Sequence, residues 1–390
     1  MEIFEKLITR TETSSVKWDR TKEVFGTNDV LPMWVADMDF EAPKEVTEAL
    51  LERVRHGVFG YTFPRLDTKE AIMKWVKRKH HWEISSEADI LFSPGVVTAL
   101  STAIQALTNK GDKVLLQSPV YTPFFSMIEK NGRKVENSPL YLHDNRYQID
   151  FRDLEQKLSM PDVKMMLLCN PHNPSGRAWT KEELQKIGDL CIKYEVIIVS
   201  DEIHSDLMLR GKIHVPFASL GNSFSNQCIT CIAPSKTFNL AGLQASAIIA
   251  ENKELREKIT TVQQQQGIGG LNALGITAMK AAYEQGDQWL EQLLLYLEEN
   301  ADILTSFIEA RLPNVKVIRP DASYLIWLDC RELNLTEQEL TRKLLYDGKI
   351  ALEPGSKYGH GGHGFIRMNI GCPKSTLNEG LLRLEKALNS

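Results

Sequence analysis

Four short apolar runs in the middle of the chain each end in a group of polar residues that can do chemistry. These groups, which supply amide, carboxylate, imidazole, hydroxyl and amine side chains, occupy residues 118–121, 170–176, 201–204 and 233–239. Lys236 follows an apolar run, and burial lowers the pKa of a lysine enough for it to act as a nucleophile or a base. Asp201 follows another, where a carboxylate is costly to bury unless a donor or a cation meets it. Together, the four groups predict a single binding site.

The same apolar runs predict the strands that must position these groups. We expect strands at residues 113–117, 163–169, 195–200, 227–232 and 245–250. Helical patterns lie between them, and one begins at Thr180, with Glu183 completing a capping box. Strands buried on both faces and alternating with helices are typical of a mostly parallel sheet in an α/β domain. In such sheets ligands bind at the carboxyl ends of the strands, where the polar groups lie.

A fifth segment, residues 93–100, predicts a turn that leads into a helix. Gly95 lets a ligand approach the backbone closely, and the free N–H groups of Val96 and Val97 at the helix start can hold a phosphate. On its own, this pattern is more often an ordinary helix start.

The C-terminal third follows a different pattern. An amphipathic helix is expected from residue 287 to 311, with leucines and isoleucines at helical spacing. Short strands at residues 315–318, 324–328 and 365–370, with helices between them, predict a smaller α+β domain. We therefore expect a large domain at residues 50–285 and a small domain made of residues 1–49 and 286–390. The long helix would be the hinge between them.

Composition limits the classes of function. The chain has 390 residues, 43% of them hydrophobic, and a net charge of −5, so it can bury a large core and has no basic excess for nucleic acid. No apolar run reaches the ~18 residues of a membrane-spanning helix, and the first residues lack the layout of a signal peptide. Six cysteines are too few for a disulfide framework. These features predict a soluble, cytoplasmic protein without nucleic-acid or membrane partners.

Two motifs contain residues of the types that bind metals, but their surroundings favour a structural role. Cys228 and Cys231 have C-x-x-C spacing, yet they lie in an apolar run that predicts a buried strand, with the two thiols on opposite faces. His360 and His363 lie in a glycine-rich loop with no cysteine or carboxylate near them in the sequence. We therefore expect no metal site.

Three of the polar segments resemble those of a known family. The serine–lysine pair Ser235-Lys236, the spacing of Asp201 and His204, and the Asn-Pro-x-Asn-Pro-x-Gly run at residues 170–176 resemble the class I and II aminotransferase family. Its members are fold-type I pyridoxal-phosphate enzymes, and the resemblance covers essentially the whole chain. Residues 33–40, 200–206 and 233–239 narrow it to the MalY/PatB branch of cystathionine β-lyases and related C–S lyases. The implied fold is an α/β large domain with a mostly parallel sheet and a smaller α+β domain.

The resemblance implies a role for each residue around the cofactor pyridoxal 5′-phosphate. Lys236 would form the Schiff base and later move the Cα proton, and Asp201 would pair with the pyridine nitrogen. Tyr121 would stack on the ring. Asn173 and His204 would flank the phenolic oxygen, with His204 standing where typical aminotransferases have a tyrosine.

The phosphate would bind the N–H groups of Val96 and Val97, the hydroxyl of Ser235 and, from a second subunit, Tyr61. The sequence departs from the wider family here, because Gln244 stands in place of an arginine and Ala233 in place of a serine. Cofactor affinity would therefore depend more on the helix terminus.

The resemblance also places the substrate. Arg367 would bind the substrate α-carboxylate, and the pocket for the rest of the substrate would lie near Trp34, Tyr61 and Tyr358. Because Tyr61 must reach the phosphate of a neighbour, a homodimer with shared active sites is implied.

The implied reaction is β-elimination from an L-amino acid with sulfur at Cβ. Cystathionine would give homocysteine, pyruvate and ammonia, a reaction of amino-acid metabolism that fits methionine biosynthesis. An aminotransferase uses the same lysine and aspartate and is the first alternative. A regulatory binding protein on the same fold is the second, since a fold alone does not fix function.

Overall fold

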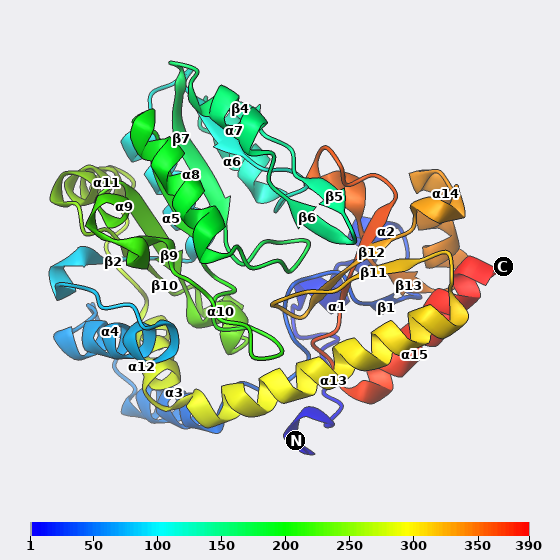
Figure 1. The fold of residues 1–390 in the computed structure, drawn as a ribbon. Coiled ribbons are helices and arrows are strands. Elements are labelled where there is room, and N and C mark those ends of the chain that lie inside the picture. Colours follow the sequence, from blue (N-terminus) through cyan, green and yellow to red (C-terminus); the bar gives the residue numbers. More distant parts are fainter. Residues whose placement is uncertain (1, 390) are drawn as a thin grey trace.

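The computed structural model describes residues 2–389, and a seven-stranded sheet with the order β2-β10-β9-β8-β7-β3-β4 lies at its centre (Figure 1). The strands are β2 (Ile90–Ser93), β3 (Lys113–Leu116), β4 (Lys134–Asn137), β7 (Val163–Cys169), β8 (Ile197–Asp201), β9 (Cys228–Ile232) and β10 (Ser246–Ile249). β4, β3, β7, β8 and β9 are parallel, whereas β10 is antiparallel to both neighbours. The predicted mostly parallel sheet is confirmed, but the sequence did not indicate the reversal of β10.

Helices cover both faces of this sheet because its strands are apolar on both sides. In β3, Val114 and Leu116 belong to one core cluster and Leu115 to the other, as the alternation of a strand requires. The first cluster lies under α5 (Val96–Leu107), α6 (Pro123–Lys130) and α11 (Lys253–Gln265), and the second under α7 (Phe151–Leu158), α8 (Lys181–Lys193) and η3 (Phe217–Leu220). Both hydrogen bonds of the predicted capping box between Thr180 and Glu183 are present at the start of α8.

A smaller antiparallel sheet follows, with the order β11-β12-β15-β14. Its strands are β11 (Lys316–Ile318), β12 (Leu325–Asp329), β14 (Glu353–Pro354) and β15 (Phe365–Asn369), and its helices include α14 (Glu337–Arg342), η6 (Lys343–Asp347) and α15 (Lys374–Asn389). The N-terminal strand β1 (Leu31–Pro32) pairs with β13 (Ile350–Ala351). This pairing supports the predicted union of residues 1–49 with residues 286–390, and the domain limits stay a prediction.

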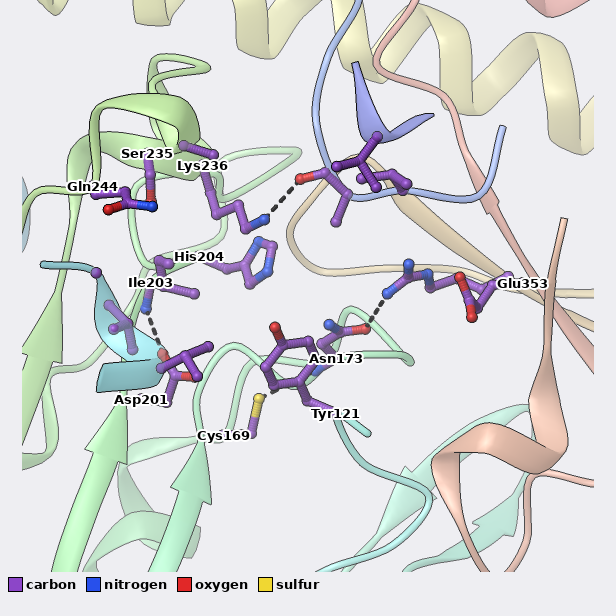
Figure 2. A pocket seen from close by; sticks show the side chains of 18 of the residues that line it. Tyr121, Cys169, Asn173, Asp201, Ile203, His204, Ser235, Lys236, Gln244 and Glu353 are labelled. Carbon is purple, nitrogen blue, oxygen red and sulfur yellow. Dashed lines mark hydrogen bonds between the residues drawn. The ribbon is translucent and has the colours of Figure 1, made fainter. Parts of the chain in front are cut away.

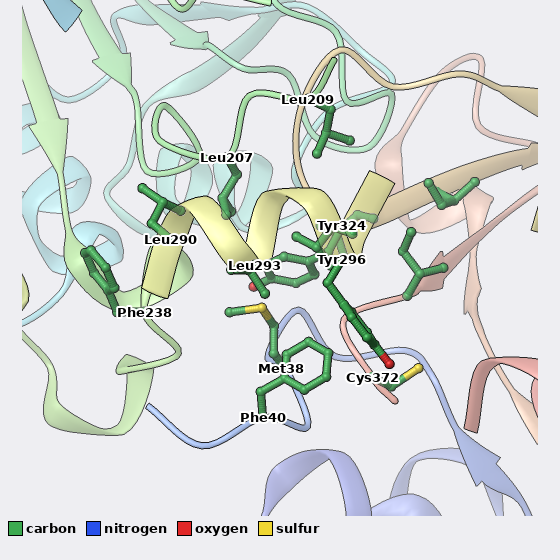
Figure 3. Close-up of a cluster of buried hydrophobic side chains, with 14 of the residues drawn as sticks. Met38, Phe40, Leu207, Leu209, Phe238, Leu290, Leu293, Tyr296, Tyr324 and Cys372 are labelled. Carbon is green, nitrogen blue, oxygen red and sulfur yellow. The ribbon is translucent and has the colours of Figure 1, made fainter. Parts of the chain in front are cut away.

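The long helix α13 (Asp287–Arg311) begins and ends at the predicted residues. Figure 1 shows it running from the α3 and α12 end of the molecule to α15. Its buried stripe collects apolar side chains from distant segments, among them Met38, Phe40, Leu207 and Phe238 (Figure 3). Each large apolar side chain buried in this way contributes about 2 kcal/mol, so α13 holds together segments that lie far apart in the sequence. Its role as a hinge stays a prediction.

The other elements are short or lie at the periphery. They are η1 (Glu2–Phe4), α1 (Val16–Asp19), α2 (Thr21–Phe25), α3 (Lys44–His56), α4 (Leu66–His80), η2 (Glu87–Asp89), β5 (Tyr141–His143), β6 (Arg146–Gln148), α9 (Asn222–Ser225), α10 (Pro234–Thr237), η4 (Ala241–Leu243), α12 (Ala273–Gln285), η5 (Arg331–Leu333) and η7 (Gly355–Tyr358). None of the helices within residues 2–389 has the length and hydropathy needed to cross a bilayer.

Candidate active site

A cavity of about 430 Å³ lies at the carboxyl ends of β7, β8 and β9, where the polar segments meet. Ten of the predicted site residues line it: Trp34, Val96, Val97, Tyr121, Asn173, Asp201, His204, Ser235, Lys236 and Arg367. The remaining lining residues are Val16, Val35, Ala36, Gly95, Cys169, Ile203, Ala241, Gln244, Ala245 and Glu353. Figure 2 shows many of these side chains around a common space. Tyr61 and Tyr358, also predicted, do not line this cavity.

Lys236 lies on the short helix α10, which begins at Pro234 directly after β9. Its Nζ donates a hydrogen bond to the carbonyl oxygen of Ala36 at 2.7 Å. Burial, reinforced by the positive charge of Arg367, lowers the pKa of Lys236 to about 8. A lysine with this pKa is partly neutral near pH 7, as a nucleophile or a base requires.

Asp201 is the last residue of β8, and its carboxylate faces the cavity with only 4% of the residue exposed. The backbone N–H of Ile203, at 3.2 Å, is its one side-chain hydrogen-bond donor among the described residues, and no cation of this part of the chain lies within 4 Å. Burial therefore raises the pKa of Asp201 to about 7, although the Ile203 hydrogen bond and the charge of Lys236 oppose the rise. A buried carboxylate with so few partners fits a ligand that brings a cationic N–H.

Tyr121, Asn173 and His204 form the walls between these two groups. Burial raises the pKa of Tyr121 to about 12, so its hydroxyl stays protonated. Burial, with the charges of Lys236 and Arg367, lowers the pKa of His204 to about 3, so its ring is neutral at pH 7. A neutral imidazole and an amide can each donate or accept a hydrogen bond without adding charge to the cavity.

One end of the cavity has the features of a phosphate site. Gly95, at φ 92°, is the N-cap of α5, and Val96 and Val97 in the first turn of this helix line the cavity. Free N–H groups in the first turn of a helix can bind an anion. Ser235 and Gln244 lie beside each other at this end (Figure 2). Neither the Ser235 nor the Gln244 side chain carries a charge. An anion at this end would therefore be bound by the helix dipole, backbone N–H groups and neutral side chains.

Ala233, where the wider family has a serine, is buried in a core cluster and does not line the cavity. The structure thus places Gln244, and not Ala233, at the phosphate end.

Arg367 lies on β15 and approaches the cavity from the smaller sheet. Its Nη1 donates to Asn173 Oδ1 at 3.0 Å and its Nη2 to the carbonyl oxygen of Trp34 at 2.8 Å. Its buried Nε has no hydrogen-bond partner among the described residues. Tyr358, predicted as a pocket residue, instead packs beneath Arg367, with the guanidinium carbon 5.4 Å from the ring centre. The fork of Arg367 is thus held in place and keeps hydrogen-bonding capacity for a carboxylate.

Residues 34–36 line the cavity, and of the segment 34–38 the sequence pointed only to Trp34 as a site residue. Besides the carbonyl groups that hold Lys236 and Arg367, this segment offers those of Val35 and Asp37 to Asn369 Nδ2, both at 2.6 Å. The motif at residues 33–40 indicated that this segment is important. It did not indicate that the backbone carbonyl groups of the segment would bind Lys236, Arg367 and Asn369.

The hydrogen bonds of Asp206, next to the turn that carries Lys236, are a second feature that the sequence did not predict. Asp206 Oδ2 accepts a hydrogen bond from Thr237 Oγ1 at 2.8 Å. Its Oδ1 accepts one from Trp75 Nε1 at 3.0 Å and lies 2.7 Å from His80 Nε2. Because Thr237 directly follows Lys236, these contacts fix the turn that carries the lysine.

Known proteins show where this chain belongs. Residues 28–384 match the family described as aminotransferase class I and II. The chain belongs to that family. A relative in it, the cystathionine beta-lyase PatB of Bacillus subtilis, is 55% identical over 99% of this chain and 100% of its own length. Protein MalY of Escherichia coli is 34% identical over 99% of both chains.

Solved structures of other class I and II family members agree. Cystalysin from Treponema denticola, which contains a pyridoxal 5′-phosphate cofactor, has a TM-score of 0.95 and 36% identity, over 99% of this chain and 98% of its own. The pyridoxal-phosphate-bound C–S lyase from Staphylococcus hominis has a TM-score of 0.92 and 32% identity, again over 99% and 98%. The predicted resemblance, its MalY/PatB branch and the fold class are therefore confirmed. The roles of the individual site residues stay predictions.

Proposed function

We propose that this chain is a pyridoxal 5′-phosphate-dependent C–S β-lyase that cleaves L-cystathionine and related cysteine S-conjugates. One observation carries the proposal: a lysine of lowered pKa and a buried aspartate without a cation face the same cavity. These are the groups that the aldehyde and the ring nitrogen of the cofactor need at opposite ends of the ring. The relatives named above, a cystathionine beta-lyase and a C–S lyase, support the choice of reaction.

The residues of the cavity fit this cofactor. Asp201 would hold the ring nitrogen and gain the cationic partner that the fold does not give it. Tyr121 would stack on the ring. At the other end, the N–H groups of Val96 and Val97 and the hydroxyl of Ser235 would bind the phosphate.

What bound pyridoxal phosphate supplies is an aldehyde for the substrate amine and a protonated ring that takes up electrons from Cα. The chain supplies the rest. Arg367 would bind the substrate α-carboxylate, and Lys236 Nζ would take up the Cα proton. Asp201 would hold the ring nitrogen in its protonated form, and Asn173 and neutral His204 would hold the phenolic oxygen.

The electron pair freed at Cα then expels sulfur from Cβ as a thiolate. Hydrolysis of the remaining fragment gives pyruvate and ammonia, so that cystathionine yields homocysteine.

A homodimer belongs to the same proposal. Tyr61 is fully exposed and points into solvent in the single chain, and Val58, Phe59, Phe63 and Leu66 near it are exposed as well. Such an apolar surface favours a partner, and Tyr61 would add a hydroxyl to the uncharged phosphate end of the partner's cavity. Mixing Tyr61→Phe and Lys236→Ala subunits tests this arrangement, because a shared site regains activity in mixed dimers. Activity that never exceeds the sum of the separate variants would contradict it.

We further place the chain in the cytoplasm and in methionine biosynthesis. All six cysteines are free and buried, which fits a reducing compartment. Homocysteine, the product of cystathionine cleavage, fits methionine biosynthesis.

The experiment that tests the function uses L-cystathionine with no 2-oxo acid present, and follows thiol and pyruvate together. Equal and catalytic amounts of both are the expected result. If thiol and pyruvate stay flat while the cofactor absorbance shifts to its amine form, the chain is an aminotransferase. If there is neither product nor spectral change, a regulatory binding protein is favoured over both enzymes.

A further inference from the structure

One charged side chain of the cavity has no role in the chemistry above. Among the described lining residues, the charged groups are Asp201, Lys236, Arg367 and Glu353. The first three serve the ring nitrogen, the Cα proton and the α-carboxylate. Glu353 remains, and sequence reasoning did not single it out.

Glu353 stands between two cations. It lies on β14 directly opposite Arg367 on β15, and its side chain is 13% exposed. Toward the surface, Lys357 Nζ lies 2.8 Å from Glu353 Oε1, and the Lys357 side chain is 41% exposed. Lys357 does not itself line the cavity, and from buried Arg367 through Glu353 to half-exposed Lys357 the charges are positive, negative and positive.

This row of charges is held at a fixed place relative to the cofactor site. Lys357 belongs to η7 (Gly355–Tyr358), which is bonded to the chain on both sides of Tyr121. The N–H of Val120 donates to the carbonyl oxygen of Tyr358 at 2.9 Å, and the hydroxyl of Thr122 donates to that of Lys357 at 2.8 Å. The backbone that carries Lys357 is thus tied to the segment that carries Tyr121, which lines the cavity.

We propose that Glu353 and Lys357 select substrates whose sulfur carries a zwitterionic far end, an inference that rests on the lyase function proposed above. Cystathionine bound at Arg367 by its α-carboxylate presents, beyond the sulfur, a carbon that carries both an ammonium and a second carboxylate. The ammonium is complementary in charge to Glu353 and the carboxylate to Lys357. An uncharged far end leaves the Glu353–Lys357 pair unchanged, and a far end with only a carboxylate meets Glu353 first and is repelled.

Three cysteine conjugates of similar length separate these cases: S-ethyl-L-cysteine, S-(2-aminoethyl)-L-cysteine and S-(2-carboxyethyl)-L-cysteine. The measurement is kcat/KM from pyruvate release by the holoenzyme. In Glu353→Gln, the ratio of the aminoethyl to the ethyl substrate should fall about tenfold, the value of one charge-assisted hydrogen bond. The ratio of the carboxyethyl to the ethyl substrate should rise in the same variant. Lys357→Gln should lower the ratio of cystathionine to the aminoethyl substrate.

Glu379→Gln is the matched control, because Glu379 forms a 2.7 Å ion pair with Arg383 on α15, outside the lining of the cavity. It should keep every ratio at the wild-type value. Ratios that also stay at the wild-type value in Glu353→Gln would overturn the inference. An equal loss on all three conjugates would overturn it too, because Glu353 would then act only by positioning Arg367. If the wild-type protein cleaves no conjugate at all, the lyase function itself fails.

Discussion

Two buried aspartates of this chain have pKa values that move in opposite directions. Asp39 accepts hydrogen bonds from Lys17 at 2.6 Å, Arg10 at 2.7 Å and Trp18 at 3.0 Å. Burial alone would raise its pKa, but Lys17 and the other donors outweigh burial and hold the pKa below its usual value. Asp201 has one backbone donor, and burial raises its pKa to about 7.

The contrast separates a structural charge, Asp39, from the charge to which we assign a role in the proposed function, Asp201. The fold completes the surroundings of Asp39 with its own cations, so this carboxylate anchors the segment that crosses the cavity. The fold leaves the surroundings of Asp201 incomplete, which costs stability in the chain alone and favours a cationic ligand. A buried group without a partner is therefore the stronger sign of a binding site than burial or charge by itself.

The largest difference in effect is expected between substitutions of the two buried lysines, Lys236 and Lys17. Lys236→Ala should reduce turnover by about 10⁴-fold, because the base and the cofactor linkage are lost together. It should also remove the absorbance of the lysine-bound cofactor. Lys17→Met should keep that absorbance while lowering the unfolding temperature, since Lys17 is 1% exposed and serves Asp39. Absorbance and activity retained in Lys236→Ala would remove this lysine from the mechanism.

Asp39→Ala should destabilise the protein by about 3 kcal/mol, because it leaves the buried ammonium of Lys17 without its partner at 2.6 Å. Urea unfolding measures the change. Asp29→Ala is the control, since its pair with Lys349 is exposed to solvent and contributes little to stability. Equal effects in the two variants would mean that burial of the Asp39 cluster adds nothing.

Whereas Asp39→Ala should destabilise the protein, Asp201→Asn should stabilise the cofactor-free protein. At pH 8 the cofactor-free variant should be more stable than the wild-type chain, on the order of 2 kcal/mol, because a buried charge is removed and the Ile203 N–H keeps an acceptor. Turnover should fall about 100-fold, because the amide cannot hold the proton on the ring nitrogen. A variant that is less stable than wild type without cofactor would show that Asp201 is a structural group.

The ionised carboxylates of Asp201 and Asp39 should also have opposite effects on how stability depends on pH. The raised pKa of Asp201 means that the folded chain holds a proton which the unfolded chain has already lost between about pH 4 and pH 7. The advantage of Asp201→Asn should therefore shrink as the pH falls from 8 to 5. Stability from Asp39 is fully present above the ordinary aspartate pKa of about 3.9, and is lost only as the pH falls through its lower folded-state value.

The smallest effect is expected at the phosphate end. Gln244→Arg should tighten cofactor binding about tenfold, because a charge-assisted hydrogen bond replaces neutral ones. Fluorescence titration of the cofactor-free protein measures this change. Unchanged affinity would mean that the helix terminus and Ser235 already satisfy the phosphate.

The sequence predicted one side of the cavity far better than the other. Asp201 ends an apolar strand, and Asn173 and Lys236 come shortly after two others. The carboxyl ends of neighbouring parallel strands meet in one place, so local pattern was enough to bring the three together. Glu353 and Ala36 carry no such pattern. Glu353 lies at the cavity because of the register between β14 and β15, and Ala36 takes part through its backbone carbonyl group. Neither feature can be recognised from the type of residue.

The apolar pattern by itself indicated five of the seven strands of the central sheet and the span of α13, and the motifs that resemble the family pointed to ten of the residues that line the cavity. Only the tertiary structure decided that Tyr358 supports Arg367 instead of lining the cavity, that residues 34–38 hold both the lysine and the arginine, and that Asp39 is satisfied while Asp201 is not. The physical reason is the distance along the chain over which the deciding interactions act. Strands and helices follow from neighbours along the chain, whereas the pKa of a buried group follows from whatever distant side chains the fold brings within hydrogen-bond distance.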